Sequence, residues 1–307
     1  ERKYANEIAY ALRERGRWKR TGNIEPFYYK GDIVRFPEDG TYLCGPCNFV
    51  GNSFKALEEH YAEVHDGDLK ARYEALGIDP ENPSGPVFND GQFKDVKAIG
   101  WVVDDYNRAQ ISINLNNYKV SPAHEVFEAA REEASKRGIS ITGSEIVGLI
   151  PLEAMLDAGR YFLRKQERST GVSDRELIHI AVKSMGLDEL APFDPEKKII
   201  EYVLRGDEGE RLVNQTVEDF TRETASESVA PGGGSVSAAV GALGAALGTM
   251  VANISSHKRG WDDRWEEFSD WAEKGKSCHE ELLRLVDADT DAFNQIMAAF
   301  GLPNKTD

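Results

Sequence analysis

Residues 97–120, KAIGWVVDDYNRAQISINLNNYKV, decide the fold of the first part of the chain. Two runs rich in β-branched and aromatic residues flank the polar residues 104–107, a pattern typical of a β-hairpin. In the second run Ile111, Ile113 and Leu115 alternate with polar residues, so they share one face of a strand. The stretch therefore predicts a hairpin with one apolar face.

The segments around this hairpin predict further helices and strands. Ser121 and Pro122 mark the start of a helix that ends at Gly138, a typical C-cap residue. Apolar periodicity and turn signals predict the other elements, which are helices over 1–19, 151–166 and 174–185 and strands over 139–150 and 196–204. Strands and helices in this order predict a small α+β sandwich, one sheet with helices on one side.

Residues 205–211, RGDEGER, carry charges and glycines but no apolar side chain, which predicts a linker between a domain at 1–204 and a domain at 212–307. Beyond the linker the pattern predicts only helices, so the second domain is expected to be all-α. Residues 236–256 are rich in Ala, Gly and Val and could be mistaken for a membrane span. Because polar residues interrupt them, we expect a tightly packed buried helix instead.

The composition excludes several classes of protein. A formal net charge of -16 over 307 residues repels phosphate backbones and anionic membranes, so neither nucleic acid nor a membrane is expected as a partner. Three cysteines are too few for a disulfide scaffold, and the cytoplasm is the expected location. The first residues lack the apolar core of a signal peptide, and both ends look cut, so a fragment of a longer protein is expected.

A Cys/His pattern lies within residues 41–66. Cys44, Cys47, His60 and His65 follow the spacing C-x2-C-x12-H-x4-H and offer the thiolate and imidazole ligands that Zn²⁺ prefers. Such a set closes a tetrahedron and leaves no open position for catalysis. The pattern predicts a structural Zn²⁺ that staples a zinc-finger-like insertion; a chance grouping in a loop is the alternative. The helix of this segment carries more acid than base, which disfavours a DNA-binding finger.

Residues 230–235, APGGGS, form a glycine-rich turn ahead of a helix. Glycines let the backbone approach a ligand closely, and the free N–H groups of a helix N-terminus suit a carboxylate or phosphate. A flexible connection between helices is an equally open interpretation. Further on, Asp287, Asp289 and Asp291 stand among apolar residues in LVDADTDAFN. Asp287 and Asp291 share one face of a helix, and Asp289 points elsewhere. The aspartates are either partly buried acids suited to catalysis or residues of a solvated acidic helix.

Together these stretches resemble the bifunctional formiminotransferase-cyclodeaminase family. IGWVVDDYNRAQISINLNNYKVSPAH, TGSEIVGLIP, DAGRYFLRKQ and SMGLDELAPFDPEKKIIEYVL are similar to the C-terminal, ferredoxin-like subdomain of the transferase. SVAPGGGSVSAAVGALGAALGTMVANIS and LVDADTDAFN are similar to the first half of the helical cyclodeaminase. The resemblance covers nearly the whole chain in order, and the zinc-finger-like segment departs from it as an insertion.

The resemblance implies a function and its ligands. The family transfers a formimino group from formiminoglutamate, a histidine breakdown product, to tetrahydrofolate, which is often polyglutamylated. Cyclodeamination then gives methenyltetrahydrofolate and ammonia. The catalytic His of the transferase is expected ahead of Glu1, and His124 is expected to be structural, so this chain would hold only parts of both sites. A dimer-based homo-oligomer is also implied, packed through the small residues Ala239, Gly244, Ala246 and Gly248.

Residue by residue, the resemblance assigns roles in both sites. Asp289 is the expected cyclodeaminase acid, because a carboxylic acid can protonate the leaving amine, and Asp287 is the alternative. The expected folate contacts are Gly232, Gly233, Gly234 and Ser235. Lys258 and Arg259 are expected to meet the polyglutamate tail. The residues expected to line the transferase cleft, at a strand-to-helix turn, are Gly143, Ser144 and Glu145. The rival interpretation is a non-catalytic, zinc-stapled interaction or dimerisation module, which folate binding would distinguish.

Overall fold

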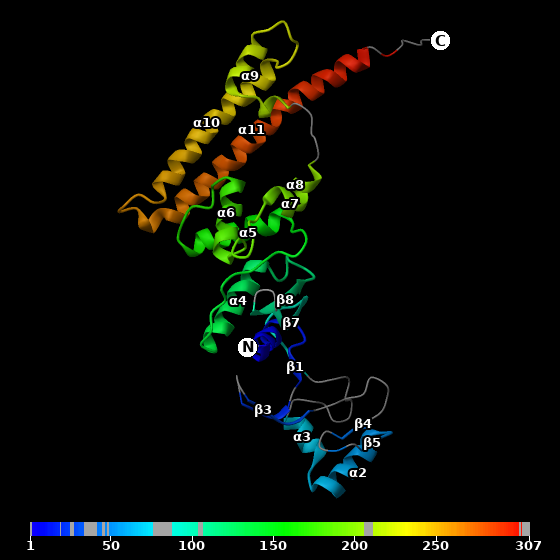
Figure 1. Cartoon of the computed structure of the whole chain (residues 1–307). Coiled ribbons are helices and arrows are strands. Elements are labelled where there is room, and N and C mark those ends of the chain that lie inside the picture. The colour runs from blue at the N-terminus through cyan, green and yellow to red at the C-terminus, as the bar shows by residue number, and fades with distance from the viewer. Residues whose placement is uncertain are drawn as a thin grey trace. The chain divides into compact units, whose positions relative to one another are not determined.

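The computed structural model describes residues 2–18, 20–24, 28–33, 42–44, 47, 49–75, 88–103, 107–205, 211–300 and 302. Contacts within the chain divide it into two compact units, Glu1–Ile141 and Thr142–Asp307. Many of the elements of both units are labelled in Figure 1.

The first unit is built on the hairpin. Strands β7 (Val96–Val103) and β8 (Arg108–Leu115) pair antiparallel from Val96↔Leu115 to Val103↔Arg108, so the predicted hairpin is confirmed. Helices α1 (Arg2–Leu12) and α4 (Ala123–Lys136) pack with it around a common core. The buried members of that core are Ile8, Leu12, Val96, Val126, Ala129, Ala130 and Ala134. Gly100 is required in β7, because a Cβ there would lie 2.3 Å from the backbone of Ala5.

The chain leaves this core after α1 and returns before β7. Strand β1 (Arg17–Trp18) pairs antiparallel with β6 (Phe88–Asn89), so residues 19–87 begin and end at one short ladder. The predicted helix over 1–19 is therefore too long: it ends at Leu12, and β1 lies within the range predicted as helix. The excursion holds the paired strands β2 (Arg20–Ile24) and β3 (Tyr28–Ile33), the paired strands β4 (Tyr42–Leu43) and β5 (Val50–Gly51), and the helices α2 (Phe54–His65) and α3 (Leu69–Ala75).

The second unit is helical among its described residues. Its elements are α5 (Leu152–Lys165), α6 (Asp174–Met185), α7 (Pro195–Lys198), α8 (Ile200–Leu204), η2 (Leu212–Asn214), α9 (Val217–Thr224), α10 (Gly233–Ser255), η3 (Asp262–Arg264) and α11 (Trp265–Phe300). The expected all-α part after the linker is therefore confirmed. Of the predicted linker, residues 206–210 lie outside the described part of the chain.

Two predicted strands are wrong. Residues 139–150 are irregular and contribute only one parallel bridge, Ile150↔Ile199, while 196–204 are the short helices α7 and α8. Asp194 accepts from the Glu196 N–H and Pro195 follows it, which starts a helix instead of a strand. Within the described residues every sheet has two strands, so the expected α+β sandwich reduces to a hairpin covered by helices.

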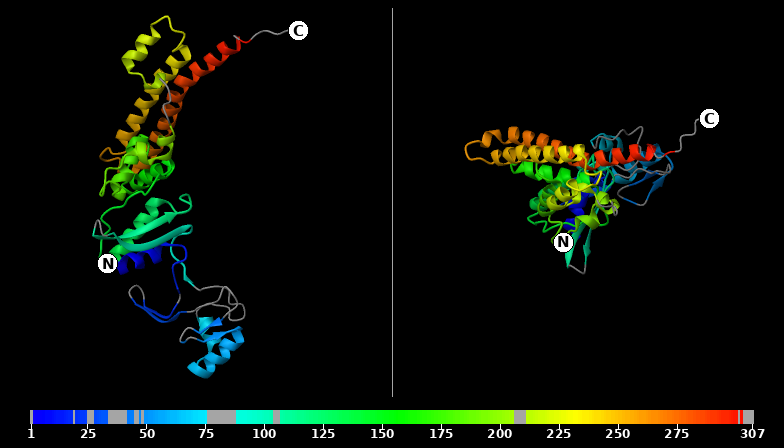
Figure 2. Two further views of the ribbon diagram at one scale, coloured as in Figure 1. Left: turned by 45° about the vertical axis from the view of Figure 1, so that its right-hand side comes forward. Right: turned by 90° about the horizontal axis from the view of Figure 1, so that it is seen from above.

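Helices α10 and α11 run side by side, as both views in Figure 2 show. Small residues lie at the contact: Ala238, Ala242 and Ala252 on α10 are almost fully buried, and a Cβ on Gly275 of α11 would lie 2.3 Å from the Thr249 hydroxyl of α10. The opposite side of α10 carries an exposed apolar stripe, formed by Val240, Leu243, Leu247, Val251 and Ile254. Among the described helices, α10 alone has the length and apolar composition that a membrane span would need.

Candidate functional site

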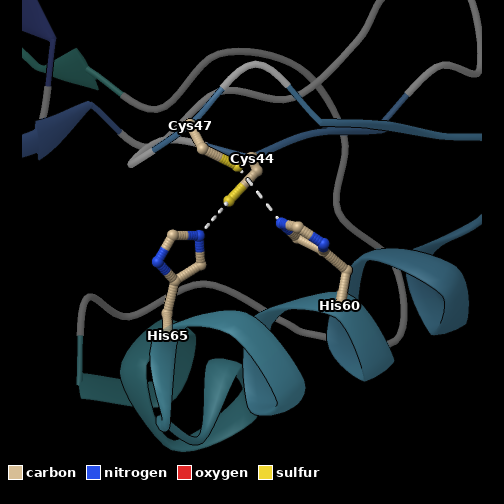
Figure 3. A group of neighbouring side chains, drawn as sticks. All are labelled: Cys44, Cys47, His60 and His65. Carbon is tan, nitrogen blue, oxygen red and sulfur yellow. Dashed lines mark hydrogen bonds between the residues drawn. The ribbon is translucent and has the colours of Figure 1, made fainter.

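The predicted metal ligands come together in the excursion. Cys44 follows β4, Cys47 lies in the turn before β5, and both histidines project from α2 toward the sulfurs (Figure 3). The Nε2 atom of His65 lies 3.3 Å from the Cys44 Sγ, and that of His60 lies 3.2 Å from the Cys47 Sγ. All four ligand atoms lie within 4.8 Å of one another.

Local structure holds these four side chains in place. The Cys44 N–H donates to the Phe49 carbonyl at 2.9 Å, which closes the turn that carries both cysteines. Ser53 caps α2 by accepting from the Ala56 N–H at 3.2 Å. The ring of Phe49 stacks on His60 with 3.9 Å between centroids. Each of these contacts spans few residues, so the sequence spacing itself sets the geometry.

A small core lies under the ligands and makes residues 42–75 a Cys/His module. Its buried residues are Cys44, Leu57, Tyr61, Leu69 and Tyr73. Burial, together with the nearby Cys44 sulfur, raises the pKa of Tyr73 to about 12. Around a tetrahedral Zn²⁺ a sulfur and a nitrogen ligand would be about 3.5 Å apart. The sulfur–nitrogen distances of 3.2 and 3.3 Å are close to that value, so these residues fit the ion.

The second candidate site joins the glycine-rich turn to α11. The Ser235 N–H donates to the Asp289 Oδ2 at 3.0 Å, and the Ser235 hydroxyl donates to the Val286 carbonyl at 2.7 Å. Ser235 is fully buried, so both polar groups need these partners. A Cβ on Gly234 would lie 2.3 Å from the Asp289 Oδ1, whereas a Cβ on Gly233 would meet nothing within 4 Å. The Asp289 carboxylate therefore occupies the N-terminus of α10, which was predicted to bind an anion.

The three aspartates of α11 have different surroundings. Asp289 is an exposed residue, so the expectation of a partly buried acid there is wrong. The reason is the place of Asp289 at the start of α10, where α10 no longer covers α11; the residues from 291 to 300 are all exposed. Asp287 is half-buried and accepts from the Leu212 N–H at 2.8 Å, which ties η2 to α11.

The other predicted contacts have structural partners. The Ser144 hydroxyl donates to the Met185 carbonyl at 2.7 Å, and a Cβ on Gly143 would lie 2.8 Å from Glu189. These residues and Glu145 lie in an irregular segment, so the predicted strand-to-helix turn is wrong. The Lys258 ammonium lies 4.1 Å from the centroid of the Trp261 ring, a cation–π contact. Arg259 is exposed beside it, and His124 is buried at the start of α4.

The sequence interpretation missed a buried polar cluster in the second unit. It joins residues 166–173, between α5 and α6, to the end of α10 and the start of α11. A short stretch of Ser, Thr and Gly between two helices carries no distinctive signal, because such residues are common in exposed loops. The cluster is visible only once the helices are packed.

Comparison with known proteins covers both parts of the chain. A family model described as "Formiminotransferase domain" matches residues 1–205, and one described as "Formiminotransferase-cyclodeaminase" matches residues 216–307. The formimidoyltransferase-cyclodeaminase of Mus musculus is 40% identical over 217 residues, which cover 70% of this chain and 40% of that protein. The chain thus spans about 40% of the length of such relatives.

Two shorter relatives each match one part. The glutamate formimidoyltransferase of Thermoplasma acidophilum is 40% identical over 75 residues, 24% of this chain and 25% of that protein. The methenyltetrahydrofolate cyclohydrolase of Methylorubrum extorquens is 36% identical over 94 residues, 31% of this chain and 45% of that protein.

Proposed function

Because the chain belongs to the formiminotransferase-cyclodeaminase family, we propose that it takes part in two consecutive reactions of folate. The first transfers a formimino group from formiminoglutamate to tetrahydrofolate. The second closes the ring of the formimino product and releases ammonia, which leaves methenyltetrahydrofolate. The observation that carries this proposal is the presence of both family matches in one chain, in that order. In this role the protein would act in histidine breakdown in the cytoplasm.

Asp289 is the proposed acid of the second reaction. The leaving amine departs as ammonia only if it gains a proton, and a carboxylic acid within reach can supply it. Asp289 is exposed, and its carboxylate contacts the glycine-rich turn. Asp287 is the weaker choice, since it is half-buried and bonds to Leu212 of η2 rather than to the glycine-rich turn.

The proposed folate contact is the exposed part of the glycine-rich turn. Gly234 is needed to admit Asp289, but the space beside Gly233 is open and its backbone can be approached. A folate bound there would place its reacting carbon near the carboxylate. Lys258 and Arg259 lie beyond the far end of α10, a helix of 23 residues or about 34 Å, so only an extended polyglutamate tail would reach them.

A structural Zn²⁺ is proposed for the Cys/His module. Cys44, Cys47, His60 and His65 would hold the ion in a closed site that supplies stability and no chemistry. The small core of residues 42–75 supports this proposal, because a module that buries so few apolar side chains needs an additional source of stability such as a metal ion.

Self-association is proposed through the exposed side of α10. A second copy of the chain is the proposed occupant, because Gly244 and Gly248 are exposed there and have nothing within 4 Å of a Cβ position. Burial of the apolar stripe against another helix would also remove it from water without a membrane. Nucleic acid is not a proposed partner, in keeping with the net charge of -16.

Folate binding tests the proposed function directly. Calorimetric titration of the chain with 5-formyltetrahydrofolate, a stable analogue, should give saturable binding. Gly233→Leu should weaken it at least tenfold by filling the open space, whereas Ala299→Leu, a similar gain in bulk at an exposed position of α11, should not. Absence of binding at millimolar ligand would favour the rival interpretation, a non-catalytic module, which the family matches disfavour.

A further inference from the structure

The loop of residues 166–173 buries polar side chains, which is unusual for a connection between helices. Ser169 and Thr170 are each 2% exposed. Buried polar groups destabilise a fold unless they are hydrogen-bonded, so their partners reveal what the loop is built to contact. Those partners lie on α10 and α11, in the segment that matches the second family model.

Asn253, near the end of α10, bonds to the loop through both ends of its amide. Its Oδ1 accepts from the Ser169 hydroxyl at 2.7 Å, and its Nδ2 donates to the Gly171 carbonyl at 2.8 Å. An amide used as donor and acceptor fixes the loop in one orientation. A lone hydroxyl in place of the amide could not keep both bonds.

Thr170 bonds to α11 through both its backbone and its side chain. Its backbone N–H donates to the Ser269 hydroxyl at 3.0 Å, and its own hydroxyl donates to the Glu273 carboxylate. Arg164, at the end of α5, also lies 3.6 Å from that carboxylate. Glu273 therefore receives a neutral donor and a cation, both from the formiminotransferase-matching part of the chain.

The backbones of the loop and α11 are in direct contact at Gly171. A Cβ at this position would lie 2.3 Å from the carbonyl carbon of Ala272 and 2.4 Å from its Cβ. Ala272 is fully buried. Only glycine fits here, because any larger residue would push α11 away from the loop.

A partly buried ion pair lies beside this contact, with a buried lysine and an aspartate whose side chain is 38% exposed. The Lys276 Nζ lies 2.5 Å from the Asp174 Oδ1, and the lysine side chain is 11% exposed. Glu280 adds a second carboxylate at 3.5 Å from the same ammonium. Because the Lys276 ammonium is largely withdrawn from water, it depends on these carboxylates, and its pair with Asp174 links α11 to the start of α6.

From these contacts we infer that residues 166–174 form a docking interface that holds the α10–α11 pair against the formiminotransferase-matching part of the same chain. Residues 142–205 of the first family match then fold together with the second match, and the two are joined by more than residues 206–210. The division of the chain into compact units agrees with this inference, since the unit Thr142–Asp307 includes helices from both family matches. Both views of the ribbon place α5 and α6 beside the loop end of the α10–α11 pair (Figure 1 and Figure 2).

Cutting the chain between the two matches tests the interface. A specific protease site is placed within residues 206–210 of the 307-residue chain, and the cleaved protein is run on a sizing column at about 1 µM. The two halves should elute together. Lys276→Met should raise the dissociation constant of the halves at least tenfold, since it leaves the Asp174 carboxylate without its cation.

Lys183→Met is the matched control. Lys183 pairs with Asp188 at the same 2.5 Å, but both residues lie in the formiminotransferase-matching half, so the loss of this pair should leave the halves together. Thr170→Val is a milder second variant, and circular dichroism confirms that each variant keeps its helices. Halves of the unaltered protein that separate after cleavage would overturn the inference. So would equal dissociation constants for folded Lys276→Met, Thr170→Val and Lys183→Met proteins.

Discussion

The Cys/His module and the α10–α11 pair both bring polar groups together, but over very different distances along the chain. The Cys44 and His65 side chains, which meet in the module, are 21 residues apart. Ser235 and Asp289, which meet in the helix pair, are 54 residues apart, and Thr170 and Glu273 are 103 apart. The module is thus a local site and the pair a long-range one, and they should respond differently to mutation.

The first prediction, and the largest expected effect, concerns the metal. Cys44→Ser should abolish tight zinc binding and unfold residues 42–75, because a structural zinc contributes on the order of 10 kcal/mol to so small a module. Metal analysis of freshly purified protein, with hydrogen exchange of the module, measures both outcomes. The α10–α11 pair should keep its exchange protection, since its own buried contacts hold it.

Cys278→Ser is the control for this experiment. Cys278 is exposed on α11 and has no place in the Cys/His cluster, so its replacement should leave the zinc content unchanged. If the Cys44→Ser protein retains one zinc per chain, the ion is held elsewhere and the proposed ligand set is wrong.

The second prediction concerns catalysis in the long-range site. Asp289→Asn should lower ammonia release by about 10²–10⁴-fold, because asparagine cannot deliver a proton. Formimino transfer should continue, and the asparagine oxygen can still accept the Ser235 N–H, so the thermal midpoint should change little. Both reactions are measured on one preparation of the full gene product. Asp287→Asn should retain activity; if it alone stops ammonia release, the acid is Asp287.

The third prediction compares neighbouring glycines. Gly234→Ala should destabilise the helix pair by about 1–3 kcal/mol, because the new methyl group overlaps the Asp289 carboxylate. Gly233→Ala meets nothing and should be neutral or slightly stabilising, by up to about 1 kcal/mol. Denaturant unfolding followed by circular dichroism measures both. In an Asp289→Ala background the cost of Gly234→Ala should shrink, and an unchanged cost would place the strain elsewhere.

These differences explain which features the sequence could predict. Period-two alternation at Ile111, Ile113 and Leu115 and the cysteine–histidine spacing are local patterns, so the hairpin and the four clustered side chains were predicted correctly. The strand at 139–150 was wrong because a short apolar run does not by itself distinguish a strand from an irregular segment, and here Val147 and Leu149 are exposed. The contact of Ser235 with Asp289 depends on how two helices pack, and no spacing in the sequence encodes it.

Helix capping shows the same contrast between local and long-range contacts. In the module, Ser53 caps α2 by accepting the N–H of Ala56, three residues later. In the helix pair the cap residue Gly232 has no side chain, and the N–H of Ser235, again three residues later, is accepted by the distant Asp289. The Asp289 carboxylate therefore caps α10 from a distant part of the chain, as the Ser53 hydroxyl caps α2 locally.

The last prediction exchanges the two kinds of cap. Ser53→Ala should cost about 1 kcal/mol, since nothing else in the described module accepts the Ala56 N–H. Gly232→Ser should change stability by only a few tenths of a kcal/mol, because Asp289 already holds that N–H and the new Cβ would lie 3.6 Å from its Oδ2, an ordinary contact. In an Asp289→Ala background the same serine should recover about 0.5–1 kcal/mol, because a local cap then replaces the lost distant one. Unfolding curves of the four proteins in this cycle measure the recovery. If serine recovers none of the stability lost in Asp289→Ala, Asp289 does not stabilise α10 by capping it. Its contact with the glycine-rich turn would then serve ligand binding instead.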